Sequence, residues 1–146
     1  MRAVVDKKFT KIFFATDIHG SERCFKKFLG AAAFYKVDTL ILGGDITGKL
    51  LIPIVDLRDG TYKADYLGKE EIVRTADELK RLEQLIVDSG YYYYRYSRSE
   101  MEEIKGSEEI IRKLFVNAMK ETLSRWVEYA EQVLRERDTT CCLLYT

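Results

Sequence analysis

Two short apolar runs with a helical pattern between them constrain the fold of this chain more than any other feature. The runs are residues 11–16 (KIFFAT) and 37–43 (VDTLILG), each of strand length. Between them, apolar side chains recur every three or four residues from Ser21, a suitable N-cap, to about Ala33. A strand, a helix and a strand within about thirty residues are typical of a parallel βαβ unit. We therefore predict an α/β fold whose first strand is buried on both faces.

An insert is predicted after this unit, over residues 50–138. Segments 50–57 and 62–67 flank Arg58-Asp59-Gly60-Thr61, and an Asp-Gly turn between two apolar segments predicts a β-hairpin. The tyrosine-rich segment 91–96 could stack on a nucleobase, but an edge strand or a packing role is favoured. The rest of the insert has helical patterns, so we expect it to be mainly helical.

Capping residues and apolar spacing predict where these helices begin and end. Thr75 and Glu78 form a capping box for a helix that ends at Gly90. A short helix over 101–105 and a long helix over 107–137 follow.

A third apolar run, residues 139–146, has the composition of the start of another buried strand. The chain of 146 residues has the length of one domain. We expect a single domain in which residues 10–49 form the βαβ core, residues 50–138 form the insert, and residues 139–146 begin a further strand.

Acidic and imidazole side chains follow both strands of the βαβ unit. Asp17 and His19 come directly after the first strand, and Asp45 follows the second at the end of Gly43-Gly44-Asp45. Parallel sheets bind ligands beyond the carboxyl ends of their strands, so these three side chains should converge. Two carboxylates and an imidazole suit Mn, Fe or Zn. An isolated D-x-H match or a capping Asp is common by chance, but both motifs at the expected strand ends favour a metal site.

In these motifs, Asp17-Ile18-His19 and Gly44-Asp45, the sequence resembles the calcineurin-like metallophosphoesterases over about residues 10–50. The resemblance implies an α/β layered sandwich and a hydrolase that splits phosphate esters at a dinuclear metal site. It also implies that Asp17 and His19 hold one ion of Mn, Fe or Zn and that Asp45 bridges to a second. The substrate would be a phosphorylated small molecule or a nucleotide.

The sequence departs from the family pattern after these motifs, where the family has a G-N-[HD] block and further histidines. Its single asparagine, Asn117, lies in a predicted helix, and its single histidine is His19. Residues 143–146 end about where the family's next strand would lead into this block. The resemblance therefore implies that the chain is an incomplete metallophosphoesterase domain, the N-terminal piece of a longer protein, with residues 10–49 as its metal-binding core. We expect this chain to bind at most one ion, weakly, and to be inactive by itself, whereas the complete protein would bind two. A catalytically inactive fragment or a binding module on the same fold is the alternative.

Residues 43–50 (GGDITGKL) suggest a different class of function, because they match the G-x-x-x-x-G-K pattern of a P-loop. Leu50 stands where a P-loop has the Ser or Thr that binds Mg²⁺, and Asp45 would place a negative charge among phosphate-binding amides. A P-loop nucleotide-binding protein is therefore the less favoured interpretation. Lys49 is kept as a candidate substrate-binding residue, because a cation near Asp45 could contact a phosphate.

Composition argues against several other classes of protein. The 24 basic and 24 acidic residues give a net charge of zero, so no bulk positive field favours nucleic acid. No apolar run reaches the ~18–20 residues of a membrane span, and residues 1–10 lack the pattern of a signal peptide, which predicts a cytoplasmic protein. The oligomeric state is left open. Because Cys24, Cys141 and Cys142 lack C-x-x-C spacing, we expect reduced, mostly buried thiols.

Overall fold

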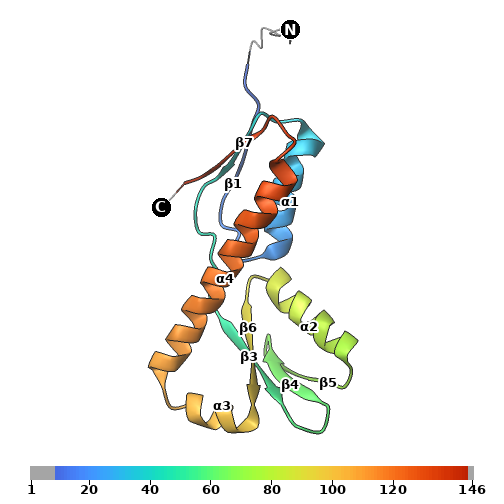
Figure 1. Cartoon of the computed structure of the whole chain (residues 1–146), viewed down its shortest axis with the longest axis vertical. Coiled ribbons are helices and arrows are strands. Elements are labelled where there is room, and N and C mark those ends of the chain that lie inside the picture. The colour runs from blue at the N-terminus through green and yellow to red at the C-terminus, as the bar shows by residue number, and fades with distance from the viewer. Residues whose placement is uncertain (1–8, 145–146) are drawn as a thin grey trace.

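The computed structural model describes residues 9–144 and shows an α/β chain with two sheets (Figure 1). Residues 1–8, where no export signal is expected, and residues 145–146, the end of the expected last strand, lie outside the described residues. In chain order the elements are β1 (Ile12–Ala15), α1 (Glu22–Tyr35), β2 (Thr39–Leu42), β3 (Leu51–Asp56), β4 (Tyr62–Tyr66), β5 (Lys69–Val73), α2 (Ala76–Asp88), β6 (Tyr92–Ser97), α3 (Arg98–Ile104), α4 (Glu108–Leu134) and β7 (Thr140–Leu143).

The first sheet has the strand order β1-β2-β7 and is parallel throughout. Phe13 of β1 is in register with Leu40 of β2, and Leu40 is in register with Cys141 of β7. The helix α1 connects β1 to β2, and its first turn is capped where the Cys24 N–H donates to Ser21 Oγ at 3.2 Å. The predicted βαβ unit is therefore confirmed.

Helix α1 and the C-terminal half of α4 pack on the same face of this sheet. Leu40 is completely buried there, and Trp126 of α4 joins the same core cluster. Ile12 and Phe14 lie on the other face and are 57% and 58% exposed. The prediction that the first strand is buried on both faces is wrong, because none of the described residues covers this second face.

The cysteines and the last strand are also more exposed than predicted. The strand β7 lies at an edge of the sheet, so Cys141 is exposed and Cys142 is half-buried. Cys24 is exposed because the buried side of α1 is formed by other residues: Phe25, Phe28, Leu29, Ala31 and Ala32. The expectation of mostly buried thiols is therefore wrong, and the expected third strand is present but not buried.

The insert contains a four-stranded sheet of order β5-β4-β3-β6, so it is less helical than predicted. The predicted hairpin is confirmed, because β3 and β4 are antiparallel and the Thr61 N–H donates to Asp59 in the turn between them. The strand β5, antiparallel to β4, has no counterpart in the sequence prediction. The strand β6 pairs in parallel with β3 at the sheet edge, as the edge interpretation of the tyrosines predicts.

The three helices of the insert occupy different places, and α4 leads from the second sheet to the first. Helix α2 begins at the predicted capping box, where the Glu78 N–H donates to Thr75 Oγ1 at 3.1 Å, and it packs on one face of the second sheet. Helix α3 begins earlier than predicted, because Ser97 provides its cap. Helix α4 passes both sheets (Figure 1): Phe115 contacts Tyr92 of β6, and Trp126 lies in the core of the first sheet. No helix within residues 9–144 is long and apolar enough to cross a membrane.

Candidate metal centre

The predicted ligands lie in the two loops that follow β1 and β2. Because these strands are parallel, both loops leave the same edge of the sheet. The loops continue side by side beyond the strands: the Asp17 N–H donates to Gly44 O at 3.2 Å, and the His19 N–H donates to Asp45 O at 3.1 Å. This backbone pairing brings the ligand loops together without using any of the ligand side chains.

All three predicted ligands have an uncommon backbone conformation. Asp17, His19 and Asp45 have φ values of 56°, 46° and 43°, in the left-handed region. Asp and His tolerate this region better than most residues, but each such position still costs about 1–3 kcal/mol. Strained residues persist where the surrounding structure determines them, and they cluster at functional sites. Three of the six non-glycine residues with a positive φ in the described part of the chain are the predicted ligands, which supports a functional site.

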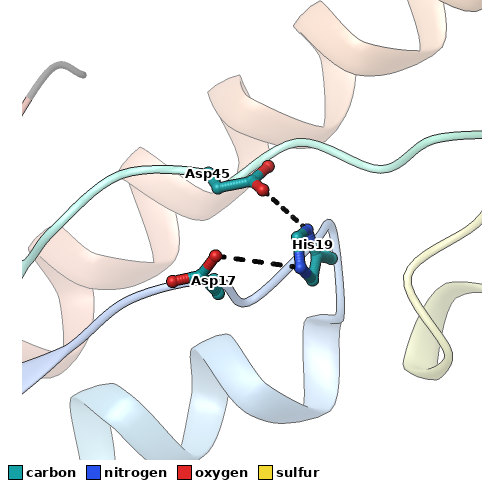
Figure 2. A group of neighbouring side chains, drawn as sticks. All are labelled: Asp17, His19 and Asp45. Atoms are coloured by element: carbon teal, nitrogen blue, oxygen red, sulfur yellow. Dashed lines mark ion pairs between the residues drawn. The ribbon is translucent and has the colours of Figure 1, made fainter.

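The side chains of the three predicted ligands lie close together, and the imidazole of His19 faces both carboxylates (Figure 2). His19 Nδ1 lies 3.2 Å from Asp45 Oδ2, and His19 Nε2 lies 4.0 Å from Asp17 Oδ1. One ligand atom from each residue lies within 4.8 Å of the others. The side chains are about half exposed, at 58% for Asp17, 40% for His19 and 46% for Asp45, so the group faces solvent and is accessible to an ion and a ligand.

His19 Nδ1 is the most informative atom of the group. It is buried and makes no hydrogen bond with any residue of the described chain. The carboxylate of Asp45 is within ion-pair distance, but its direction does not satisfy a hydrogen bond. A buried polar atom without a partner is costly, and a cation between the imidazole and the carboxylates would satisfy it. This atom and the mixed N and O donor set therefore fit a divalent transition-metal ion.

Other predicted residues are not brought into this group. Lys49 is exposed, and its contact with a substrate phosphate stays a prediction. Asn117 is exposed on α4, as the helical pattern predicts. Sequence reasoning missed the close approach of Gly90 to the carbonyl oxygen of His19 and of Gly48 to the carbonyl oxygen of Gly90. Gly90 is recognisable in the sequence only as a helix stop.

The loop after β2 does not have the structure of a P-loop. A P-loop leads into a helix whose N-terminal amides bind phosphate, whereas residues 43–50 lead into the strand β3. In addition, the Gly48 N–H already donates to Tyr92 Oη at 2.9 Å in a buried hydrogen bond. The geometry therefore does not favour the nucleotide-binding alternative.

A half-open cleft of about 660 Å³ is lined in part by Asp45, one of the predicted ligands. Residues 44–47 form one wall, and three leucines form the apolar part, Leu123 of α4 with Leu143 and Leu144 at the end of β7. Because Asp45 belongs both to this cleft and to the ligand group, a molecule in the cleft would lie beside a bound ion.

Compared with protein-family models, curated proteins and solved structures, the chain has no match. The functional argument therefore rests on the residues and their geometry.

Proposed function

We propose that this protein is a metal-dependent phosphoesterase in which Asp17, His19 and Asp45 bind a divalent cation. The observation that carries the proposal is the grouping of these side chains, with one ligand atom of each within 4.8 Å of the others, together with the buried, unpartnered Nδ1 of His19. The resemblance of the two ligand motifs to the calcineurin-like metallophosphoesterases supports the same chemistry, and with it a layered sandwich for the complete fold.

A divalent ion at such a site supplies Lewis acidity and an activated water for attack on a phosphate ester. The residues of this chain would hold the ion and orient the substrate beside it. Asp17 and His19 come from one loop and Asp45 from the other, so the ion would be fixed at the edge of the first sheet. The cleft beside Asp45 would receive the organic part of a phosphorylated small molecule or nucleotide, and Lys49 would contact its phosphate.

The number of ions separates the proposal from its alternative. The family resemblance implies two ions, but the described residues that converge provide ligands for one. We propose that this chain binds one ion weakly and that its turnover is close to background. A metal-binding module without turnover is the second candidate, and it is favoured because Asn117, the single asparagine, lies inside the helix α4 and not in a loop that follows a strand.

The test is a titration with Mn²⁺ by calorimetry. Mn²⁺ is chosen because the exposed thiols of Cys24 and Cys141 would bind softer ions. We expect one ion per chain with a Kd weaker than about 1 µM, which is a binding free energy of ~8 kcal/mol. Asp17→Ala, His19→Ala and Asp45→Ala should each weaken binding, whereas Asp65→Ala, an exposed aspartate of β4, should not. Binding that is unchanged in His19→Ala would refute the site.

Hydrolysis of nitrophenyl phosphate mono- and diesters, with Mn²⁺ and after chelation, distinguishes the two candidates. A small metal-dependent rate that disappears in Asp45→Asn supports a phosphoesterase. If Mn²⁺ binding is weakened by the three ligand substitutions but no metal-dependent hydrolysis is measured, the binding module is supported.

A further inference from the structure

We propose that residues 88–92 are the positioning element of the metal centre. This segment, called the turn below, runs from the last residue of α2 to the first residue of β6. It lies in the insert and contains none of the ligands. The inference rests on the proposed metal site and adds to it the residues that hold His19 and the Asp45 loop in place. It is based on backbone contacts that leave no room for a side chain.

Glycines form the closest contacts between this turn and the ligand loops. A Cβ on Gly90 would overlap the carbonyl oxygen of His19, and a Cβ on Gly48 would overlap the carbonyl oxygen of Gly90. A Cβ on Gly20 would lie 2.6 Å from the Cα of Gly48. The two ligand loops and the turn therefore meet backbone to backbone, one residue after His19 and three residues after Asp45.

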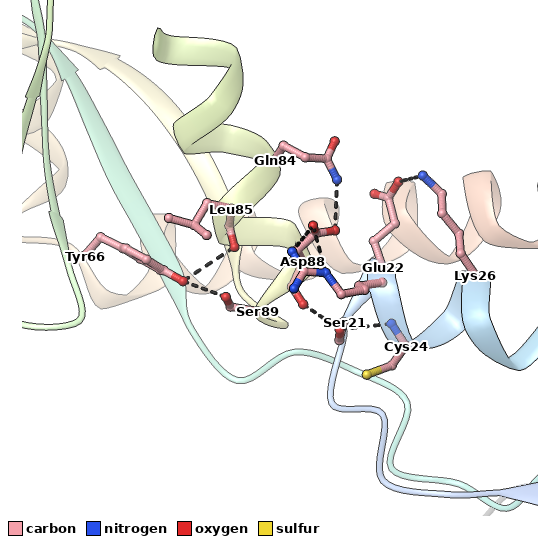
Figure 3. A network of polar contacts seen from close by, with 10 residues as sticks. Ser21, Glu22, Cys24, Lys26, Tyr66, Gln84, Leu85, Asp88 and Ser89 are labelled. Carbon is pink, nitrogen blue, oxygen red and sulfur yellow. Dashed lines mark hydrogen bonds and ion pairs between the residues drawn. The ribbon is translucent and has the colours of Figure 1, made fainter.

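Side-chain hydrogen bonds also hold the turn against the two ligand loops, at the place that we call the junction. Tyr92 Oη accepts the N–H of Gly48 at 2.9 Å, and burial raises the pKa of this phenol. On the other side, Ser21 Oγ donates to the carbonyl oxygen of Asp88 at 2.5 Å (Figure 3). Arg23 donates to the carboxylate of Asp88 at 2.8 Å. The turn is thus bonded to the residues that follow both groups of ligands.

These contacts act on the ligands through the backbone. His19 has a left-handed conformation, and Gly90 packs directly against its carbonyl group. Holding this carbonyl group fixes the backbone from which the imidazole projects. Residues that orient metal ligands commonly change metal affinity by 10–100-fold when they are replaced. We expect the turn to be such an element.

The experiment replaces two glycines of the junction, Gly48 and Gly90, by alanine. Each variant is compared with a matched variant at a glycine that has free space around it. Gly90→Ala is paired with Gly60→Ala, because their φ values are 87° and 85° but nothing lies near Gly60. Gly48→Ala is paired with Gly106→Ala, which also has open space and needs no left-handed backbone. Tyr92→Phe removes only the hydroxyl group. If Gly90→Ala fails to fold, Gly48→Ala and Tyr92→Phe decide the question.

Two measurements are made on each variant. Mn²⁺ calorimetry should show affinity reduced on the order of tenfold in Gly48→Ala and Gly90→Ala, and unchanged in Gly60→Ala and Gly106→Ala. His19 is the single histidine, so its imidazole NMR signals are assigned without ambiguity, and in metal-free protein they should shift in the junction variants only.

The outcomes separate this inference from the proposed function. If wild-type protein binds Mn²⁺ and the junction variants equal their controls in affinity and in the His19 signals, the positioning role is overturned while the metal site stands. If wild-type protein binds no Mn²⁺, the proposed function fails, and the His19 signals in metal-free protein alone decide whether the turn positions this residue.

Discussion

The rings of Phe25 and Trp126 are stacked, with centroids 4.3 Å apart and planes within 5° of parallel. This contact joins α1 to α4 over the first sheet, and both residues are almost fully buried. It is the point where the insert's longest helix joins the core that carries the ligand loops.

We expect Trp126→Ala to lower the free energy of unfolding by about 3–5 kcal/mol, because it removes a large buried ring and leaves a cavity. Urea unfolding followed by circular dichroism measures the change. Val127→Ala, the next residue along α4 and 60% exposed, is the control and should change stability by well under half of that amount. Equal effects of the two substitutions would contradict the described packing of α4.

The two faces of the first sheet should respond differently to truncation. Leu40→Ala, on the face under α1 and α4, should cost about 2–5 kcal/mol, because this side chain is completely buried. Ile12→Ala, on the opposite face and 57% exposed, should cost less than about 1 kcal/mol. The midpoints of thermal unfolding of the two variants test the comparison. A loss of stability in Ile12→Ala as large as that in Leu40→Ala would show that the face with Ile12 is covered in solution.

The carboxyl group of Asp88 should make stability dependent on pH. Burial opposes its ionisation, but hydrogen bonds from Arg23 and Gln84 outweigh this and lower its pKa below the ordinary value. A group whose pKa is lowered in the folded state stabilises the protein above its unfolded pKa of about 3.9, and this contribution is lost as the pH falls through the folded value. The stability difference between wild type and Asp88→Asn should therefore be present at pH 7 and shrink by pH 3.

Asp65→Asn provides the reference for that measurement, since Asp65 is exposed on β4. Urea titrations at each pH give the free energies. A difference for Asp88→Asn that is the same at pH 3 and pH 7 would exclude the ionised carboxylate as the cause.

Bound metal should stabilise the folded chain. An ion that binds only the folded state adds stability that grows with its concentration, by about 2.7 kcal/mol at one hundred times Kd. We expect Mn²⁺ to raise the midpoint of thermal unfolding, and chelation to reverse the shift. His19→Ala should abolish most of it, whereas an equal shift in wild type and His19→Ala would place the ion elsewhere.

Local patterns predicted the parts of this structure that depend on neighbouring residues. The Thr75–Glu78 capping box and the hairpin at Asp59 were predictable, since turn and cap chemistry lies within a few residues. The convergence of Asp17, His19 and Asp45 was also predictable, because parallel strands place their carboxyl ends at one edge.

Features that depend on distant segments could not be predicted in this way. The parallel pairing of β3 with β6 joins residues such as Leu51 and Tyr92, and nothing in either segment specifies the other. The approach of Gly90 to His19 also joins distant segments. It could not be predicted, because the end of a helix is enough to account for a glycine at position 90. The strand β5 is missed because its sequence, KEEIV, is mostly charged and largely exposed, without the apolar alternation of a half-buried strand.

The passage of α4 along both sheets has a thermodynamic consequence. Phe115 packs against Tyr92 of the second sheet, and Trp126 further along packs against Phe25 over the first sheet, so each sheet loses a packing contact if this helix melts. The two sheets should therefore lose structure in one cooperative transition, with coincident curves from different spectroscopic probes. Because Phe115 packs on Tyr92, whose hydroxyl accepts the Gly48 N–H, fraying of the helix at Phe115 should loosen the loop that carries Asp45.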